Sequence, residues 1–73
     1  MSVTVYTKPA CVQCTATKRK LDELGVEYDT IDLLTTEGAL EKVRALGFQQ
    51  APIVITDSDS WSGYQPERLS KLA

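Results

Sequence analysis

The chain has 73 residues, of which 42% are hydrophobic and 25% charged, so it has the composition of one small globular domain rather than of a disordered segment. Its net charge of −2 gives no indication of nucleic-acid binding, and no apolar run is long enough to span a membrane. The first residues lack the pattern of a signal peptide, and two cysteines cannot form the disulfide framework of a secreted protein. We therefore expect a single domain over residues 1–73 in a reducing cytoplasm, with no nucleic-acid or membrane partner.

The first part of the chain predicts a strand, a helix and a second strand. Residues 3–7 are alternating and mostly β-branched or aromatic, which is typical of a strand, and Pro9 ends it because proline cannot pair in a central strand. Residues 12–24 contain no Gly or Pro and repeat Cys, Thr and Leu at helical spacing, and Gly25 follows as a helix stop. Residues 27–32 predict the second strand, which should be parallel to the first because a helix connects the two.

The second part of the chain predicts a helix, a hairpin and a last helix. Residues 36–46 carry an apolar stripe at helical spacing, although Gly38 is unfavourable near the helix start. Residues 53–56 are a β-branched run typical of a buried strand, and residues 61–64 predict a short edge strand and a bend. Pro66 suits the first turn of a final helix. The order βαβαββα predicts an α/β fold with a four-stranded mixed sheet flanked by three helices.

The strongest functional signal is the C-x-x-C motif of Cys11 and Cys14, which lies where the first strand gives way to the first helix. Both side chains fall on one helix face, so their sulfurs can meet with little backbone movement. The unpaired N–H groups and partial positive charge of a helix N-terminus stabilise a thiolate, and Lys8 adds a positive charge nearby. We therefore expect Cys11 to attack a disulfide and the more interior Cys14 to resolve the mixed disulfide. This placement is typical of thioredoxin-like redox proteins.

Other uses of the cysteine pair are less consistent with the sequence. A disulfide that closes a loop of about four residues contributes only about 2 kcal/mol, which is little for a structural staple. A closed zinc site needs four ligands, and the chain has two Cys and no His. A copper(I) site on the two thiolates, or a cluster shared between two chains, is chemically possible. Copper carriers of this size usually have a Met before the first Cys and no helix between their middle strands, whereas this chain has Pro9 and Ala10 before Cys11 and a predicted helix at 36–46. A copper(I) metallochaperone stays as the remote alternative.

Pro52 and Trp61 are further candidates for the site. An X-Pro bond is cis in only about 5% of cases in folded proteins, so frequency alone favours a trans Ala51-Pro52 bond. A proline that leads directly into a buried strand needs a local reason, however. A cis bond beside the sulfurs would leave the backbone of Ala51 free to pair with a substrate strand. Trp61 suits either the core or a contact with a partner.

Three motifs together resemble the NrdH-redoxins, which are small glutaredoxin-like proteins with thioredoxin-like activity. The motifs are VYTKPxCVxC at 5–14, QAP at 50–52 and WSG at 61–63, and the resemblance covers essentially the whole chain. It implies a thioredoxin fold and a thiol–disulfide oxidoreductase with a reversible Cys11–Cys14 disulfide and no bound cofactor or metal. It also implies a bacterial, cytoplasmic electron carrier that reduces the large subunit of class Ib ribonucleotide reductase. Electrons would come from NADPH through the FAD enzyme thioredoxin reductase, and we expect the carrier to be a monomer.

The same resemblance assigns roles by position. Cys11 resembles the attacking thiol, Cys14 the resolving thiol, and Pro52 the cis-proline that packs against the pair. The residues expected to bind a substrate or partner are Thr7, Lys8, Val12, Gln13, Ala51, Pro52, Trp61, Ser62 and Gly63.

The segment at 61–66 argues against glutathione as the reductant. Glutaredoxins that use glutathione usually carry Gly-Gly followed by acidic residues before the last helix, whereas this segment has only Gly63 and no acid until Glu67. A glutathione-dependent glutaredoxin or a general protein disulfide reductase remains the second hypothesis. One departure from the family is Tyr64-Gln65, where NrdH-redoxins commonly have Phe-Arg. Because Gln65 lacks a fixed charge and a bidentate donor, no binding role is transferred to it.

Overall fold

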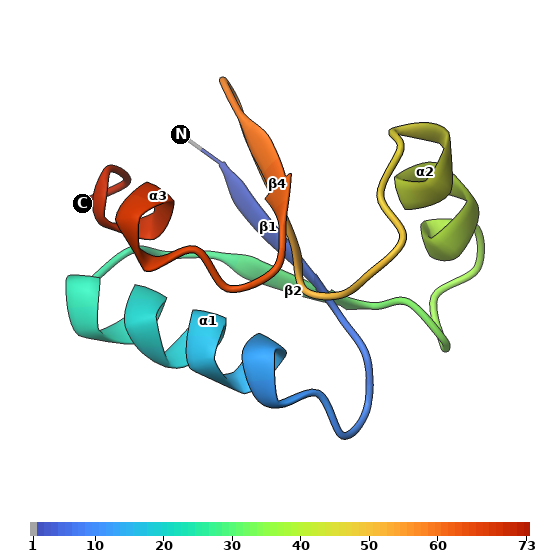
Figure 1. The fold of residues 1–73 in the computed structure, drawn as a ribbon, viewed down its shortest axis with the longest axis horizontal. Coiled ribbons are helices and arrows are strands. Elements are labelled where there is room, and N and C mark those ends of the chain that lie inside the picture. Colours follow the sequence, from blue (N-terminus) through green and yellow to red (C-terminus); the bar gives the residue numbers. More distant parts are fainter. Residues whose placement is uncertain (1) are drawn as a thin grey trace.

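The computed structural model describes residues 2–73 and contains a four-stranded mixed sheet between helices (Figure 1). The elements in chain order are β1 (Val3–Thr7), α1 (Val12–Leu24), β2 (Asp29–Asp32), α2 (Ala39–Ala45), β3 (Ile53–Thr56), β4 (Ser60–Ser62) and α3 (Pro66–Ser70). The strand order is β2-β1-β3-β4, in which β1 and β2 are parallel and the other neighbours are antiparallel. The predicted order βαβαββα is confirmed. Among residues 2–73, no helix is long and apolar enough to cross a membrane.

Two predicted elements are shorter in the structure than in the sequence analysis. The helix expected from residue 36 begins at Ala39, because Gly38 takes a left-handed conformation (φ 81°) and ends the preceding turn. The strand expected from residue 27 begins at Asp29, which pairs with Thr4 close to the start of β1. The residues just after α1 cannot yet pair in the sheet, because they are bound to the end of that helix. The Val26 N–H donates a hydrogen bond to the Leu21 carbonyl at 3.0 Å.

The sheet separates two apolar layers, because successive side chains of a strand point to opposite faces. Figure 1 shows α1 and α3 together on one side of the sheet and α2 on the other. The buried core on the α1–α3 side consists of Val3, Val5, Leu21, Val54, Trp61 and Leu69. The buried core on the α2 side consists of Tyr6, Leu33, Ala39, Val43 and Ile53. The first layer fixes α1 on the sheet, and with it the position of the C-x-x-C motif.

Tyr28 fastens the segment before β2 to α1. Its hydroxyl donates a hydrogen bond to Asp22 Oδ1 at 3.0 Å and lies 3.5 Å from the carbonyl oxygen of Lys18. Burial, and after it the hydrogen bond and the negative charge of Asp22, raise the pKa of Tyr28 above its ordinary value of 10.0. The folded protein therefore holds the phenolic proton more tightly than the unfolded chain does.

We expect the free energy of unfolding to fall more steeply above about pH 10 in the wild type than in Tyr28→Phe. The raised pKa contributes stability that is fully present below the unfolded pKa and is lost as the pH rises through the folded pKa. Urea unfolding of both proteins at a series of pH values between about 9 and 11 measures the difference. If the free energies of unfolding of the two proteins fell in parallel with pH over this range, Tyr28 would titrate alike in the folded and unfolded chains, which would contradict the prediction.

Candidate redox site

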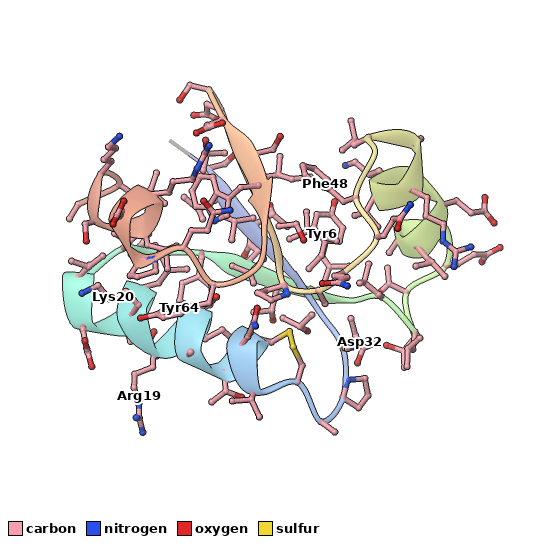
Figure 2. The ribbon with its side chains drawn as sticks, in the orientation of Figure 1. Tyr6, Arg19, Lys20, Asp32, Phe48 and Tyr64 are labelled. Atoms are coloured by element: carbon pink, nitrogen blue, oxygen red, sulfur yellow. A yellow bond between two sulfur atoms is a disulfide. The ribbon has the colours of Figure 1, made fainter. Side chains whose placement is uncertain are left out.

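Cys11 and Cys14 form a disulfide at the first turn of α1 (Figure 2). Their Cα atoms are 5.2 Å apart. Ala10 has a positive φ of 56° in the turn between β1 and α1, and Cys11 follows as the N-cap with an extended backbone. The Cys11 Sγ accepts a hydrogen bond from the N–H of Cys14 at 3.1 Å. The motif thus takes the place of a capping residue, with its first sulfur directed at the free N–H groups of the helix.

The two sulfurs differ in their access to solvent. Cys14 is 2% exposed, whereas Cys11 is half-buried. An outside disulfide can therefore reach Cys11 but not Cys14. Once the pair is reduced, the N–H groups and partial positive charge of the helix N-terminus favour the thiolate of Cys11. This arrangement suits attack by Cys11 on a foreign disulfide. The buried Cys14 can then attack Cys11 in the mixed disulfide and release the target.

The loop before β3 lies beside the cysteine motif. The Ala51-Pro52 bond is cis, as the resemblance implied and against the trans isomer that frequency alone favours. Pro52 is buried and Ala51 is half-buried. A shallow depression at this point is lined by Lys8, Ala10, Cys11, Val12, Gln13, Gln50 and Ala51. The structure thus brings residues 50–51 to the cysteines from a distant part of the chain.

The residues expected around the thiols differ in how far they are free to contact a partner. Val12 is 84% exposed directly beside Cys11, and Lys8 and Gln13 are also exposed. Thr7 is only 9% exposed, and its carbonyl accepts a hydrogen bond from the Leu33 N–H at 2.8 Å. Thr7 is therefore fixed at the end of the sheet, while Lys8 and Val12 form an open rim. Gln13 is exposed beside them, but its side-chain oxygen is already hydrogen-bonded within the molecule.

Trp61 lies in the core, where it is 4% exposed. Of the two roles considered for this ring, the structure shows the packing one. The guanidinium of Arg68 lies 5.6 Å from the ring centroid and forms an ion pair with Asp59 at 2.8 Å. Trp61 therefore supports the start of α3 from inside the molecule.

Ser62 and Gly63 hold the bend after β4 against the loop of Pro52. The Ser62 hydroxyl donates to the Gln50 carbonyl at 2.6 Å, and the Gly63 N–H donates to the Pro52 carbonyl at 2.7 Å. Gln65 donates from Nε2 to the Ser62 carbonyl at 2.9 Å, so its amide stabilises the bend itself. The motifs at 50–52 and 61–63 are thereby joined in space.

Sequence reasoning missed two residues of this region, Gln50 and Tyr64. Gln50 lines the depression, and the Tyr64 N–H donates to Gln13 Oε1 at 3.3 Å. The Gln50 position could have been found, since it belongs to the QAP motif. Within residues 2–73, no group of three or more His, Cys, Asp or Glu side chains is arranged to hold a metal ion. The two thiols are the soft ligands that the site could offer.

Known proteins resemble this chain over almost its whole length. The Glutaredoxin family model matches residues 3–61. The glutaredoxin-like protein NrdH of Salmonella typhimurium is 40% identical over 72 residues, which cover 99% of this chain and 89% of that protein. The corresponding protein of Escherichia coli K12 is 42% identical with the same coverage. The solved structure of the Escherichia coli NrdH-redoxin superposes with a TM-score of 0.97 at 41% identity, covering 100% of this chain and 96% of that one. The thioredoxin fold expected from the sequence is thereby confirmed.

Proposed function

Because the chain belongs to the glutaredoxin family, and within it to the NrdH proteins, we propose that it carries electrons from thioredoxin reductase to class Ib ribonucleotide reductase. The observation that carries the proposal is the similarity to NrdH proteins over 99% of the chain, with the C-x-x-C pair at disulfide distance. The pair itself makes the protein a thiol–disulfide oxidoreductase. The two protein partners are the proposed part.

The reaction follows from the different burial of the two sulfurs. The Cys11 thiolate attacks one sulfur of the target disulfide, and the other target sulfur leaves as a thiolate and takes up a proton. The buried Cys14, as its thiolate, then attacks Cys11 Sγ, which forms the Cys11–Cys14 disulfide and releases the second target thiolate. Two electrons pass to the target in each cycle, and thioredoxin reductase returns them from NADPH through its FAD.

The partner surface that we propose is the depression around Cys11. Val12 supplies an apolar wall, Lys8 a positive charge, and the backbone of Ala51 an edge to which an extended partner segment can pair. Thr7, Pro52 and Trp61 support this surface from within, because each is buried. Gln13, Ser62 and Gly63 complete the rim.

Thioredoxin reductase is favoured over glutathione as the electron source by two facts. The solved Escherichia coli relative is described as glutaredoxin-like with a thioredoxin-like activity profile. The bend at 61–66 also lacks the second glycine and the acidic residues with which glutaredoxins hold the tripeptide. We place the carrier in a bacterial cytoplasm, because the dithiol form is the one that reduces a target and thiols are kept reduced there. We also propose that it acts as a single-domain monomer.

We expect this protein to support formation of deoxyribonucleotides by a class Ib ribonucleotide reductase, with thioredoxin reductase and NADPH as the only electron source. The product is measured by chromatography over time. A matched reaction with Cys14→Ser should give no sustained turnover, because that variant cannot release its target. Failure of the wild type with an active ribonucleotide reductase, while thioredoxin reductase and NADPH still reduce the Cys11–Cys14 disulfide, would remove the proposed target. The protein would then be a disulfide reductase for other proteins.

A further inference from the structure

Gln13 lies between the two cysteines, and its side chain reaches across to the bend after β4. Gln13 Oε1 accepts a hydrogen bond from the Tyr64 N–H at 3.3 Å. The same oxygen lies 3.6 Å from the position that a Cβ would take on Gly63, so it packs directly on that residue. Figure 2 shows Tyr64 beside α1. The cysteine motif is therefore linked to a segment 51 residues further along the chain.

The bend is bound on its other side to the cis-proline loop. Gly63 has a φ of 85°, and this left-handed turn directs two successive N–H groups to different partners. The Gly63 N–H donates to the Pro52 carbonyl at 2.7 Å, and the next N–H, that of Tyr64, donates to Gln13. Three segments thus form one hydrogen-bonded frame beside the cysteine motif.

The two links of this frame differ in strength and exposure. The link to Pro52 is short, joins two backbone groups and ends on a buried residue. The link to Gln13 is longer and depends on an exposed side chain. Loss of the Gln13 acceptor should therefore free the bend from the cysteine motif while the bend stays bound to the proline loop. The distance between Cys11 and Tyr64 would then no longer be fixed.

We propose that Gln13 is a positioning residue that holds the bend at Gly63 and Tyr64 against the cysteine motif and so sets the surface on which a protein disulfide docks. Val12, 84% exposed, lines the depression around Cys11, and Tyr64, 38% exposed, lies outside it beside Gln13. A protein segment that reaches Cys11 extends beyond the depression and meets this bend, whereas a small disulfide needs only Cys11. The inference rests on the dithiol reaction proposed above, and it does not depend on which protein is the natural target.

Two substitutions separate positioning from direct contact. Gln13→Met keeps the length of the side chain and replaces the amide oxygen by a thioether sulfur, which is only a weak acceptor, whereas Gln13→Glu keeps an oxygen acceptor for the Tyr64 N–H. Each pre-reduced variant is mixed with insulin, as a protein disulfide, and with 2-hydroxyethyl disulfide, as a small neutral one. The ratio of the two second-order rate constants is compared, because a changed thiolate fraction at Cys11 alters both rates alike.

We expect the ratio of the insulin rate constant to the 2-hydroxyethyl disulfide rate constant to fall about fivefold in Gln13→Met. This is the change that corresponds to the net free energy of one hydrogen bond. In Gln13→Glu the ratio should stay within about twofold of wild type. Gln49→Met is the matched control, because Gln49 is an exposed glutamine outside the depression and its loss should leave the ratio unchanged. Amide hydrogen exchange of Tyr64 in the disulfide form should become faster in Gln13→Met and stay slow in Gln13→Glu.

An equal fall of the ratio in both Gln13 variants would mean that the amide contacts the substrate itself, which would overturn the positioning role. An unchanged ratio in Gln13→Met would overturn it as well. Neither thioredoxin reductase nor ribonucleotide reductase is present in these reactions. A negative result here is therefore distinct from a failure of the proposed partners.

Discussion

Replacement of Cys11 by serine is expected to lower the rate of disulfide reduction by about a thousandfold or more. Only a thiolate attacks a disulfide at a useful rate, and a serine hydroxyl is not ionised near neutral pH. Cys11 caps α1 and is half-buried, and serine is a favourable N-cap, so the fold should be retained. Stopped-flow mixing of the pre-reduced variant with insulin, compared with the reduced wild type, measures the loss.

The matched variant Cys14→Ser should behave differently, because it keeps the attacking thiol. It should accumulate a mixed disulfide with its target, visible by mass spectrometry as one covalent adduct that dithiothreitol removes. The 2% exposure of Cys14 explains why this residue should not form such an adduct alone. An adduct that forms with Cys11→Ser and not with Cys14→Ser would reverse the two roles.

Replacement of Leu21 by alanine is expected to lower the free energy of unfolding by about 2–5 kcal/mol. Leu21 is 0% exposed and packs α1 on the first core layer. A domain of this length has a total stability of only about 4–11 kcal/mol, so the substitution removes a large share of it. The melting temperature of the disulfide form should fall by at least about 8 °C.

Leu46→Ala is the matched control for this prediction, because the same side chain is 54% exposed at the end of α2. Its effect on the free energy of unfolding should stay within about 0.5 kcal/mol. Equal losses at the two positions, measured by urea unfolding of both variants, would contradict the assignment of α1 to the first core layer.

The elements with strong flanking signals could be predicted from the sequence. The bounds of β1, α1 and β3 agree with the expected ranges, because Pro9, Gly25 and Pro52 mark their ends. The start of α2 could not be predicted from the apolar stripe at 36–46. The helix begins only after Gly38, whose backbone is left-handed and which offers no side-chain cap. Before it, Asp32 Oδ1 accepts the N–H groups of Leu34 and Thr35 and organises the turn after β2.

The cysteine pair could be predicted because its chemistry is local in sequence. The frame around it could not, because it depends on bonds between distant segments. The link between Gln13 and Tyr64 spans 51 residues, and that between Ser62 and Gln50 spans 12. The core position of Trp61 likewise depends on how β4 and α3 meet, which no local pattern decides.

The most direct test of the electron source is NADPH oxidation with this protein and insulin, followed at 340 nm in two parallel reactions with about equal carrier concentration. One reaction contains thioredoxin reductase, and the other contains glutathione and glutathione reductase. We expect sustained NADPH consumption with thioredoxin reductase and only the background rate with glutathione. Consumption with glutathione alone would contradict the proposed carrier and identify a glutathione-dependent glutaredoxin.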